Sequence, residues 1–132
     1  MKKLKMLCAA MLAVILSLLL LPVSLAEEQA MVVDLAGLFT DAEVADMEAV
    51  ITDIRDTYQM DAVVLTVNLS RRSDSELEAY ADAFYEECGY GLGDDRSGVL
   101  IMLDMGNRYI HISTAGSMIS YLNDRRKEQV QE

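Results

Sequence analysis

The sequence predicts an α/β domain with a mixed central sheet, and three observations carry this prediction. Two capped amphipathic segments are each followed by a short, almost wholly hydrophobic segment rich in β-branched residues, which is typical of helices leading to buried strands. Gly106-Asn107 then separates the second hydrophobic segment from an alternating one, which indicates a hairpin. Strands joined through a helix are parallel and hairpin strands are antiparallel, so the sheet is predicted to be mixed.

The N-terminus explains why an acidic chain of 132 residues has a positive mean hydropathy. Residues 1–26 hold three lysines, an apolar run over residues 6–21, Pro22, and a small-x-small pattern at Ser24 and Ala26, which predict a secretory signal cleaved before Glu27. The alternative is retention of residues 6–21 as a membrane anchor, although a spanning helix needs about 20 apolar residues. We therefore expect an exported, extracytoplasmic or cell-envelope protein.

The remaining chain has the composition of one acidic globular domain. Residues 1–26 hold three of the 11 basic residues and none of the 22 acidic ones, so their removal leaves 106 residues with a net charge of −14. Such a chain lacks the positive surface that nucleic-acid binding requires. One cysteine remains, Cys88, which excludes an internal disulfide; it is predicted to be a small core residue at a helix end. We expect a monomer with its domain in residues 27–122 and a polar helical start in residues 123–132.

The first predicted helix begins after Thr40 and runs for about five turns. Thr40 and Glu43 have the spacing of a capping box, and Phe39 and Val44 have the spacing of a hydrophobic staple. Apolar side chains then recur at alternating spacings of three and four residues, which indicates one buried helix face. This face comprises Val44, Met47, Ile51, Ile54 and Tyr58.

A strand and a second helix are predicted next. Residues 61–67 are short and nearly continuous in their hydrophobicity, which favours a strand covered on both faces. Ser73 and Glu76 repeat the capping box, and Gly89 is placed to end the helix that follows. The apolar stripe of this helix comprises Leu77, Tyr80, Ala81, Phe84 and Cys88.

The third part of the predicted fold is a hairpin. Residues 99–103 predict a buried strand that is parallel to residues 61–67 through a right-handed crossover. A two-residue Gly106-Asn107 loop would pair Leu103 with Ile110 and Ile101 with Ile112, and place His111 opposite Met102. A short helical turn with Met118, Ile119 and Leu122 is predicted after Gly116.

Residues 89–98 are the strongest candidate for a binding site, because four glycines and two adjacent aspartates lie there between a helix end and a strand. A nucleotide cofactor is not expected, since phosphate loops run from strand to helix and neither GxGxxG nor Gly-Lys-Ser/Thr is present. One histidine and one cysteine supply a zinc site poorly. The carboxylates of Asp94 and Asp95, joined through the fold by Asp34 or Asp104, would suit calcium or magnesium. The alternative is a solvated acidic loop.

Two other polar features have simpler interpretations. His111 is a candidate general base, but an isolated strand histidine is more often a surface or partly covered residue. Arg71-Arg72 is a candidate anion site or a solvated pair ahead of a capped helix. We find neither a Gly-x-Ser-x-Gly nor an HExxH motif.

Five segments follow the signal-like N-terminus in a characteristic order: residues 33–40, 62–67, 80–85, 89–91 with 97–101, and 108–114. Together they resemble the TPM domain family over roughly residues 31–122. The resemblance implies a three-layer α/β/α sandwich-like domain with a mixed central sheet, in exported or organelle-lumen proteins. It also implies further C-terminal helices, which this sequence does not complete by Glu132.

The resemblance also implies a function. Some TPM members bind calcium, others are accessory factors for membrane complexes, and acid phosphatase activity has been attributed to a plant member. Carried to this chain, the candidate ligands are Asp34 before the first helix and Asp94 and Asp95 in the glycine-rich loop. We expect an exported module that binds a divalent cation, calcium in preference to magnesium, and a protein partner at the membrane surface. The alternative is a metal-assisted phosphatase, although the negative charge would repel phosphorylated substrates.

Overall fold

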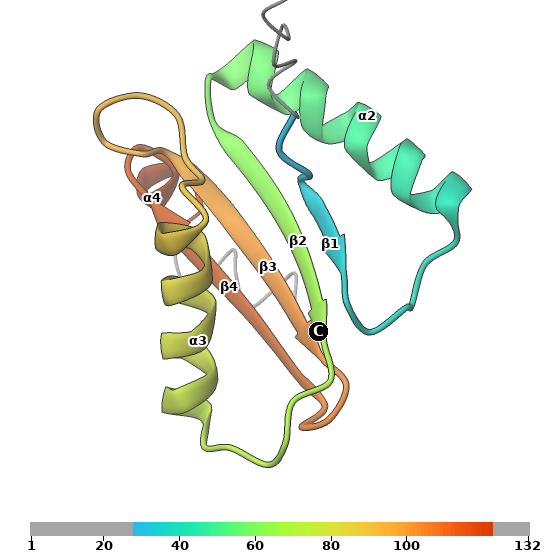
Figure 1. Cartoon of the computed structure of the whole chain (residues 1–132). Helices are drawn as coiled ribbons and strands as arrows, with labels where there is room; N and C mark the ends of the chain where they lie inside the picture. Colours follow the sequence, from blue (N-terminus) through green and yellow to red (C-terminus); the bar gives the residue numbers. More distant parts are fainter. Residues whose placement is uncertain (1–27, 123–132) are drawn as a thin grey trace, which may run out of the picture.

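The computed structural model describes residues 28–122, which form a four-stranded sheet with two long helices (Figure 1). The strand order is β1-β2-β3-β4, with β1, β2 and β3 parallel and β4 antiparallel to β3. The predicted α/β fold with a mixed sheet is confirmed. The elements are β1 (Val32–Asp34), α2 (Asp41–Tyr58), β2 (Asp61–Val67), α3 (Asp74–Glu87), β3 (Gly98–Asp104), β4 (Tyr109–Ala115) and α4 (Met118–Tyr121).

Both long helices begin at the predicted capping boxes. The Thr40 amide donates to Glu43 Oε2 at 2.8 Å, and the Glu43 amide donates to Thr40 Oγ1 at 3.3 Å. Before α3, the Ser73 amide donates to Glu76 Oε2 at 2.8 Å. The amide and the hydroxyl of Thr40 and of Ser73 donate to the Glu43 and Glu76 carboxylates and lower their pKa values, because a protonated carboxyl group would accept these hydrogen bonds less well. The backbone amides of both N-cap residues are thus hydrogen-bonded to glutamate side chains of the first helical turn.

α2 and α3 pack on the same face of the sheet. β1, β2 and β3 follow one another in one direction, so two right-handed crossovers place both connecting helices on one side. One contact of each helix supports this arrangement. Arg55 of α2 forms an ion pair with the Asp61 carboxylate, and Tyr85 of α3 lies against Gly98. Asp61 and Gly98 are register partners in β2 and β3, so both helices contact the same face of the sheet. The core fills the space between the sheet and these helices; its buried members include Ile51, Val63, Leu65, Leu77, Ala81, Leu100 and Met102.

The hairpin has the predicted register. Leu103 pairs with Ile110, Ile101 with Ile112, and Met102 with His111, so these three expectations are confirmed. α3 packs beside β4 through two polar contacts. Tyr109 Oη donates to Glu78 Oε1 at 3.3 Å, and Ser113 Oγ donates to Asp82 Oδ1 at 2.5 Å. The Tyr109 and His111 rings stack with their centroids 6.3 Å apart, so His111 is a partly covered strand residue as expected.

Two predicted core residues are at the surface. Tyr58 was placed on the buried face of α2, but its side chain is 59% exposed because the helix ends there, at the edge of the sheet. Cys88 is exposed, which corrects its prediction as a core residue. It is the C-cap residue of α3 and still has helical backbone angles, so it lies at the very end of the helix, where Tyr85 and Tyr90 occupy the buried positions instead.

The predictions for the two ends of the chain concern residues outside the described range. The predicted signal or anchor in residues 1–26 and the polar tail in residues 123–132 lie outside the described residues. Between residues 28 and 122, the helices are all too short or too polar to cross a bilayer.

Candidate metal site in the Gly/Asp loop

Residues 89–97 connect α3 to β3 as a tight loop, which we call the Gly/Asp loop. Leu92 and Ser97 exchange two backbone hydrogen bonds, at 3.1 and 2.8 Å, so the intervening residues form a closed turn. Gly91 has a φ of +100°, and a side chain there would overlap the Arg96 carbonyl. Its amide donates to Oδ2 of the buried Asp61 at 2.7 Å, which fixes the loop to the start of β2. The loop is therefore held at the N-terminal edge of the parallel strands.

Asp95 joins the Gly/Asp loop to the turn before α4. Its Oδ1 accepts a hydrogen bond from Ser97 Oγ at 2.8 Å, and its Oδ2 accepts from the amide and the Oγ of Ser117 at 3.0 and 2.8 Å. Gly116 permits this approach: its φ is +57°, and a Cβ there would lie 2.5 Å from Ser97 Oγ. The Ser97 and Ser117 hydrogen bonds lower the pKa of Asp95, so this carboxylate is ionised at neutral pH.

Asp94 and Asp95 have no cationic partner among residues 28–122. The exposed Asp94 side chain makes no hydrogen bond within this range. Arg96, the nearest basic residue in sequence, instead donates from Nε and Nη2 to the Tyr90 carbonyl, at 3.1 and 2.9 Å. Within the described part of the chain, the single ion pair joins Arg55 to Asp61. Two adjacent carboxylates thus lack a cationic partner in this range, and the hydrogen bonds from Ser97 and Ser117 compensate only Asp95.

Asp34 lies at the opposite edge of the sheet, where it closes the turn between β1 and α2. Its carboxylate accepts hydrogen bonds from the Leu38 amide at 3.0 Å and the Phe39 amide at 2.9 Å, and also from Thr66 Oγ1 on β2. The Thr66 hydrogen bond is the main reason that the pKa of Asp34 is lowered, followed by the two amides. The donors show that Asp34 organises this turn.

Asp104 also lies at that edge, at the end of β3, and is buried. Oδ1 accepts from the amides of Leu69 and Gly106, both at 3.0 Å, and Oδ2 accepts from Asn107 Nδ2 at 2.6 Å. This carboxylate therefore connects the loop after β2 to the turn after β3.

The structure does not bring Asp34 or Asp104 to the Gly/Asp loop, which corrects the expectation that either joins Asp94 and Asp95. The seven residues of β3 separate the two edges by about 20 Å at the usual strand rise. Over residues 28–122, no three histidine, cysteine or acidic side chains are grouped as metal ligands. Metal binding at the Gly/Asp loop stays a prediction that rests on Asp94 and Asp95.

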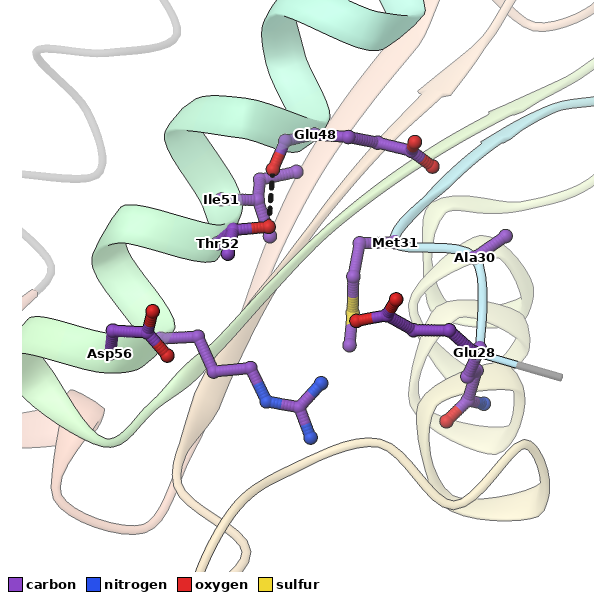
Figure 2. A pocket seen from close by; sticks show the side chains of 9 residues that line it. Glu28, Ala30, Met31, Glu48, Ile51, Thr52 and Asp56 are labelled. Atoms are coloured by element: carbon purple, nitrogen blue, oxygen red, sulfur yellow. Dashed lines mark hydrogen bonds between the residues drawn. The ribbon is translucent and has the colours of Figure 1, made fainter. Parts of the chain in front are cut away.

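A cavity of about 730 Å³ lies between residues 28–31 and α2 (Figure 2). Met31 and Ile51 are its buried apolar side chains, and Glu28, Glu48 and Asp56 place carboxylates around it. Arg55 also lines it, and its Nε lies 3.4 Å from Asp61 Oδ1, a buried oxygen without a hydrogen-bond partner in the described structure. Three carboxylates around one guanidinium disfavour a phosphorylated ligand in this cavity.

The comparisons with known proteins identify the family. The family model of the TPM domain, named TPM_phosphatase, matches residues 32–132. The chain belongs to the TPM domain family. A similar solved structure is the solution NMR structure of the N-terminal domain of a protein from P. gingivalis, with 25% identity and a TM-score of 0.65. The match covers 80% of this TPM chain and 66% of that one. No curated protein matches the chain.

Sequence reasoning missed three residues that shape the Gly/Asp loop of this TPM domain. Ser117 lies 22 residues from Asp95, and no sequence pattern relates the two. Ser97 was noted only as part of the loop, although its Oγ contacts both Asp95 and the Ser117 amide. Asp61 offered one signal, namely a single acidic residue at the start of an otherwise hydrophobic strand. That signal indicates a buried anchor, because a buried carboxylate needs donors.

The lowered carboxyl pKa values predict a loss of stability in acid. An acidic group whose pKa is lower in the folded than in the unfolded protein stabilises the folded state at pH values above its unfolded pKa. This stabilisation is lost as the pH falls through the pKa of the folded protein. Asp34 and Asp95 titrate below their usual 3.8, and Glu43 and Glu76 below their usual 4.5. We expect the urea midpoint to be constant from pH 7 to about 5 and to fall steeply below pH 4. An Asp34→Asn variant should show a shallower fall; an equal fall would exclude Asp34 as a contributor.

Proposed function

We propose that this TPM domain binds calcium at the Gly/Asp loop and acts as an accessory module at the cell envelope. The observation that carries the proposal is the uncompensated pair Asp94 and Asp95, because the guanidinium of Arg96 is turned to the Tyr90 carbonyl. A bound cation would supply the missing positive charge. The hydroxyls of Ser97 and Ser117, which already contact Asp95, add oxygen donors beside the carboxylates.

The donor set favours calcium over magnesium and predicts weak binding. Calcium accepts six to eight oxygen ligands in irregular geometry, whereas magnesium demands a near-ideal octahedron and dehydrates reluctantly. Two carboxylates and two hydroxyls leave several positions for water. Calcium sites in extracellular modules have Kd values on the order of 10⁻⁴ to 10⁻³ M. We expect the affinity of this loop to lie in that range.

Calcium is expected to stabilise the full chain through Asp94. At a calcium concentration ten times Kd, the stabilisation is about 1.4 kcal/mol, which raises Tm by roughly 5–10 °C for a domain of this size. Asp94→Asn should abolish the shift while leaving the metal-free Tm unchanged, because the Asp94 side chain makes no hydrogen bond in the described structure. Differential scanning calorimetry with and without calcium measures both values.

The matched control is Asp46→Asn, which removes one exposed carboxylate from α2. If calcium acts only by screening negative charge, Asp46→Asn and Asp94→Asn will reduce the shift equally, and the site is excluded. Asp95→Asn should abolish the calcium shift and also lower the metal-free Tm, because the Asn amide group cannot accept both the Ser117 and Ser97 hydrogen bonds. A calcium shift that survives in Asp94→Asn contradicts the proposal.

The export part of the proposal rests on the N-terminal pattern of lysines, an apolar run and a small-x-small site in residues 1–26. Fractionation of cells expressing the chain, with mass spectrometry of its N-terminus, tests it. A mature protein that begins at Glu27 outside the cytoplasm supports a cleaved signal. An intact chain in the membrane fraction supports the anchor alternative, and an intact cytosolic chain contradicts export.

A metal-assisted phosphatase is the second candidate, favoured by the name of the family model that matches residues 32–132. A bound cation at the Gly/Asp loop would polarise a phosphoryl oxygen and offset the repulsion by the acidic surface. Hydrolysis of p-nitrophenyl phosphate separates the two functions. Calcium-dependent turnover that disappears in Asp94→Asn would favour the enzyme; calcium binding without turnover favours the accessory module.

A further inference from the structure

We propose that the edge of the sheet opposite the Gly/Asp loop docks on the surface of an anionic phospholipid bilayer. This surface, which we call the basic edge, consists of the loops 35–40, 68–73 and 105–108, which follow β1, β2 and β3. Figure 1 shows all three loops at the same end of the molecule, away from the loop that connects α3 to β3. Docking at the basic edge is independent of calcium binding, because no residue of the Gly/Asp loop belongs to this edge.

Positive charge is concentrated on the basic edge of an otherwise acidic chain. Its three loops contain none of the 22 acidic residues. They contain Arg71, Arg72 and Arg108, whereas the rest of the described range has only Arg55 and Arg96 as basic residues. Arg55 and Arg96 are engaged by Asp61 and by backbone carbonyls, respectively. The exposed arginines of residues 28–122 that neither pair with a carboxylate in a salt bridge nor donate to backbone carbonyls through their guanidinium are therefore gathered at one edge.

Asn107 holds the loops that carry the three arginines side by side. Its Oδ1 accepts from the Arg72 amide at 3.0 Å, and its Nδ2 donates to the Ser70 carbonyl at 3.2 Å. Arg108 follows Asn107 directly and is exposed, as are Arg71 and Arg72. The Arg72 guanidinium lies 5.8 Å from the centre of the Tyr80 ring, which orients it.

Exposed apolar side chains accompany the arginines. Leu35 is 68% exposed and Met105 is 51% exposed, and Leu38 lies in the same loop as Leu35 and is 39% exposed. Their positions are fixed, since the Leu35 amide donates to the Thr66 carbonyl at 3.0 Å and the Met105 amide to the Val67 carbonyl at 2.9 Å. These two contacts place Leu35 and Met105 on either side of the end of β2.

The nearest carboxylates limit the strength of docking. Asp34 and Asp104 accept several hydrogen bonds within the edge, and Glu43 and Glu76 return to their capping amides. The exposed Asp41 and Asp74 directly follow two of the loops, in the first turns of α2 and α3, and oppose an anionic surface. Docking should therefore use the loop tips and weaken with salt.

A bilayer fits this surface better than an acidic protein does. Membrane-surface segments combine arginines, which meet anionic headgroups, with apolar side chains, which enter the acyl boundary. The basic edge interleaves the two kinds of side chain. An acidic protein would match the arginines and leave Leu35, Leu38 and Met105 without a complementary environment.

Tryptophan reporters in the full chain locate the contact, because the native sequence contains no tryptophan. Met105→Trp should show blue-shifted emission and quenching by brominated lipid with phosphatidylglycerol vesicles, but not with pure phosphatidylcholine vesicles. Val50→Trp, at a position 61% exposed on α2, is the matched reporter and should not change. This comparison remains valid if residues 1–26 attach the chain to the vesicle, since only the docked edge moves the Met105→Trp signal.

The arginines are tested in the Met105→Trp background. An arginine near an anionic surface contributes about five-fold to the docked-to-undocked ratio, so R71Q/R108N should lower the ratio about 25-fold and abolish the shift near the wild-type midpoint. Asn at residue 108 suits the φ of +52° there. A49E/T57E, on exposed positions of α2, lowers the net charge equally and should leave docking unchanged.

Three outcomes would overturn the proposal. The first is equal shifts for Met105→Trp and Val50→Trp. The second is a Met105→Trp shift that persists in R71Q/R108N. The third is the absence of a Met105→Trp emission shift with phosphatidylglycerol vesicles. If poly-glutamate shifts this emission and the vesicles do not, the basic edge is assigned to an acidic protein instead. Unchanged Tm values for all variants establish that folding does not cause the differences.

Discussion

Asp104→Ala is expected to destabilise the domain by about 3 kcal/mol, enough to lower Tm by roughly 12–24 °C. The buried carboxylate accepts hydrogen bonds from the Leu69 and Gly106 amides and from Asn107 Nδ2. Its removal leaves these donors without a partner in a buried place, and each loss costs about 1 kcal/mol or more. The loops after β2 and β3 would then lose their common anchor.

The Asp104→Asn variant distinguishes a structural role of Asp104 as an anchor from a role as a metal ligand. The Asn carbonyl oxygen can still accept from the two amides, but its NH₂ group would face Asn107 Nδ2, so the expected loss is about 1–2 kcal/mol. Urea unfolding without calcium measures both variants, with Asp94→Asn as the control at less than about 0.5 kcal/mol. Wild-type stability in Asp104→Ala, combined with loss of the calcium shift, would contradict the anchor role and restore Asp104 as a ligand.

Leu65→Ala is expected to cost about 3 kcal/mol, within the usual range of about 2–5 kcal/mol for a buried leucine. Leu65 is fully buried in the centre of β2 and faces the helix layer, where its loss leaves a cavity that the paired strands cannot close. Leu35→Ala, at a position 68% exposed, should change the unfolding free energy by less than about 0.5 kcal/mol. Similar losses in the two variants would contradict the placement of Leu65 in the core and of Leu35 at the surface.

Much of the fold follows from local chemistry that a sequence displays. The capping boxes at Thr40 and Ser73 fix the helix starts, and the β-branched run in residues 61–67 is the strand β2 without a shift of either end. The hairpin register follows because only one pairing places the alternate aliphatic side chains on one face. β1 was not predicted because three residues are too few to show an alternating hydrophobic pattern. Cys88 was misplaced because a helical stripe does not show how far the covered part of the helix extends.

The candidate site was only half predictable. The Gly/Asp loop is conspicuous in composition, and the structure keeps Asp94 and Asp95 exposed and without a cationic partner in residues 28–122. A sequence shows acidic residues but not their donors, so Asp34 and Asp104 resembled ligands although backbone amides occupy them. The contact of Asp95 with Ser117 depends on the return of β4 beside β3 and has no local signature.

The most direct test of calcium binding at the Gly/Asp loop is a calcium titration of the ¹⁵N-labelled chain, observed through backbone amide resonances. Calcium binding at this loop should produce saturable shifts at residues 93–97 and at Ser117, whose amide donates to Asp95. The amides of Leu38 and Leu69, which donate to Asp34 and Asp104, should not move. Shifts centred on Leu38 or Leu69, or small changes spread evenly over all acidic segments, would contradict it.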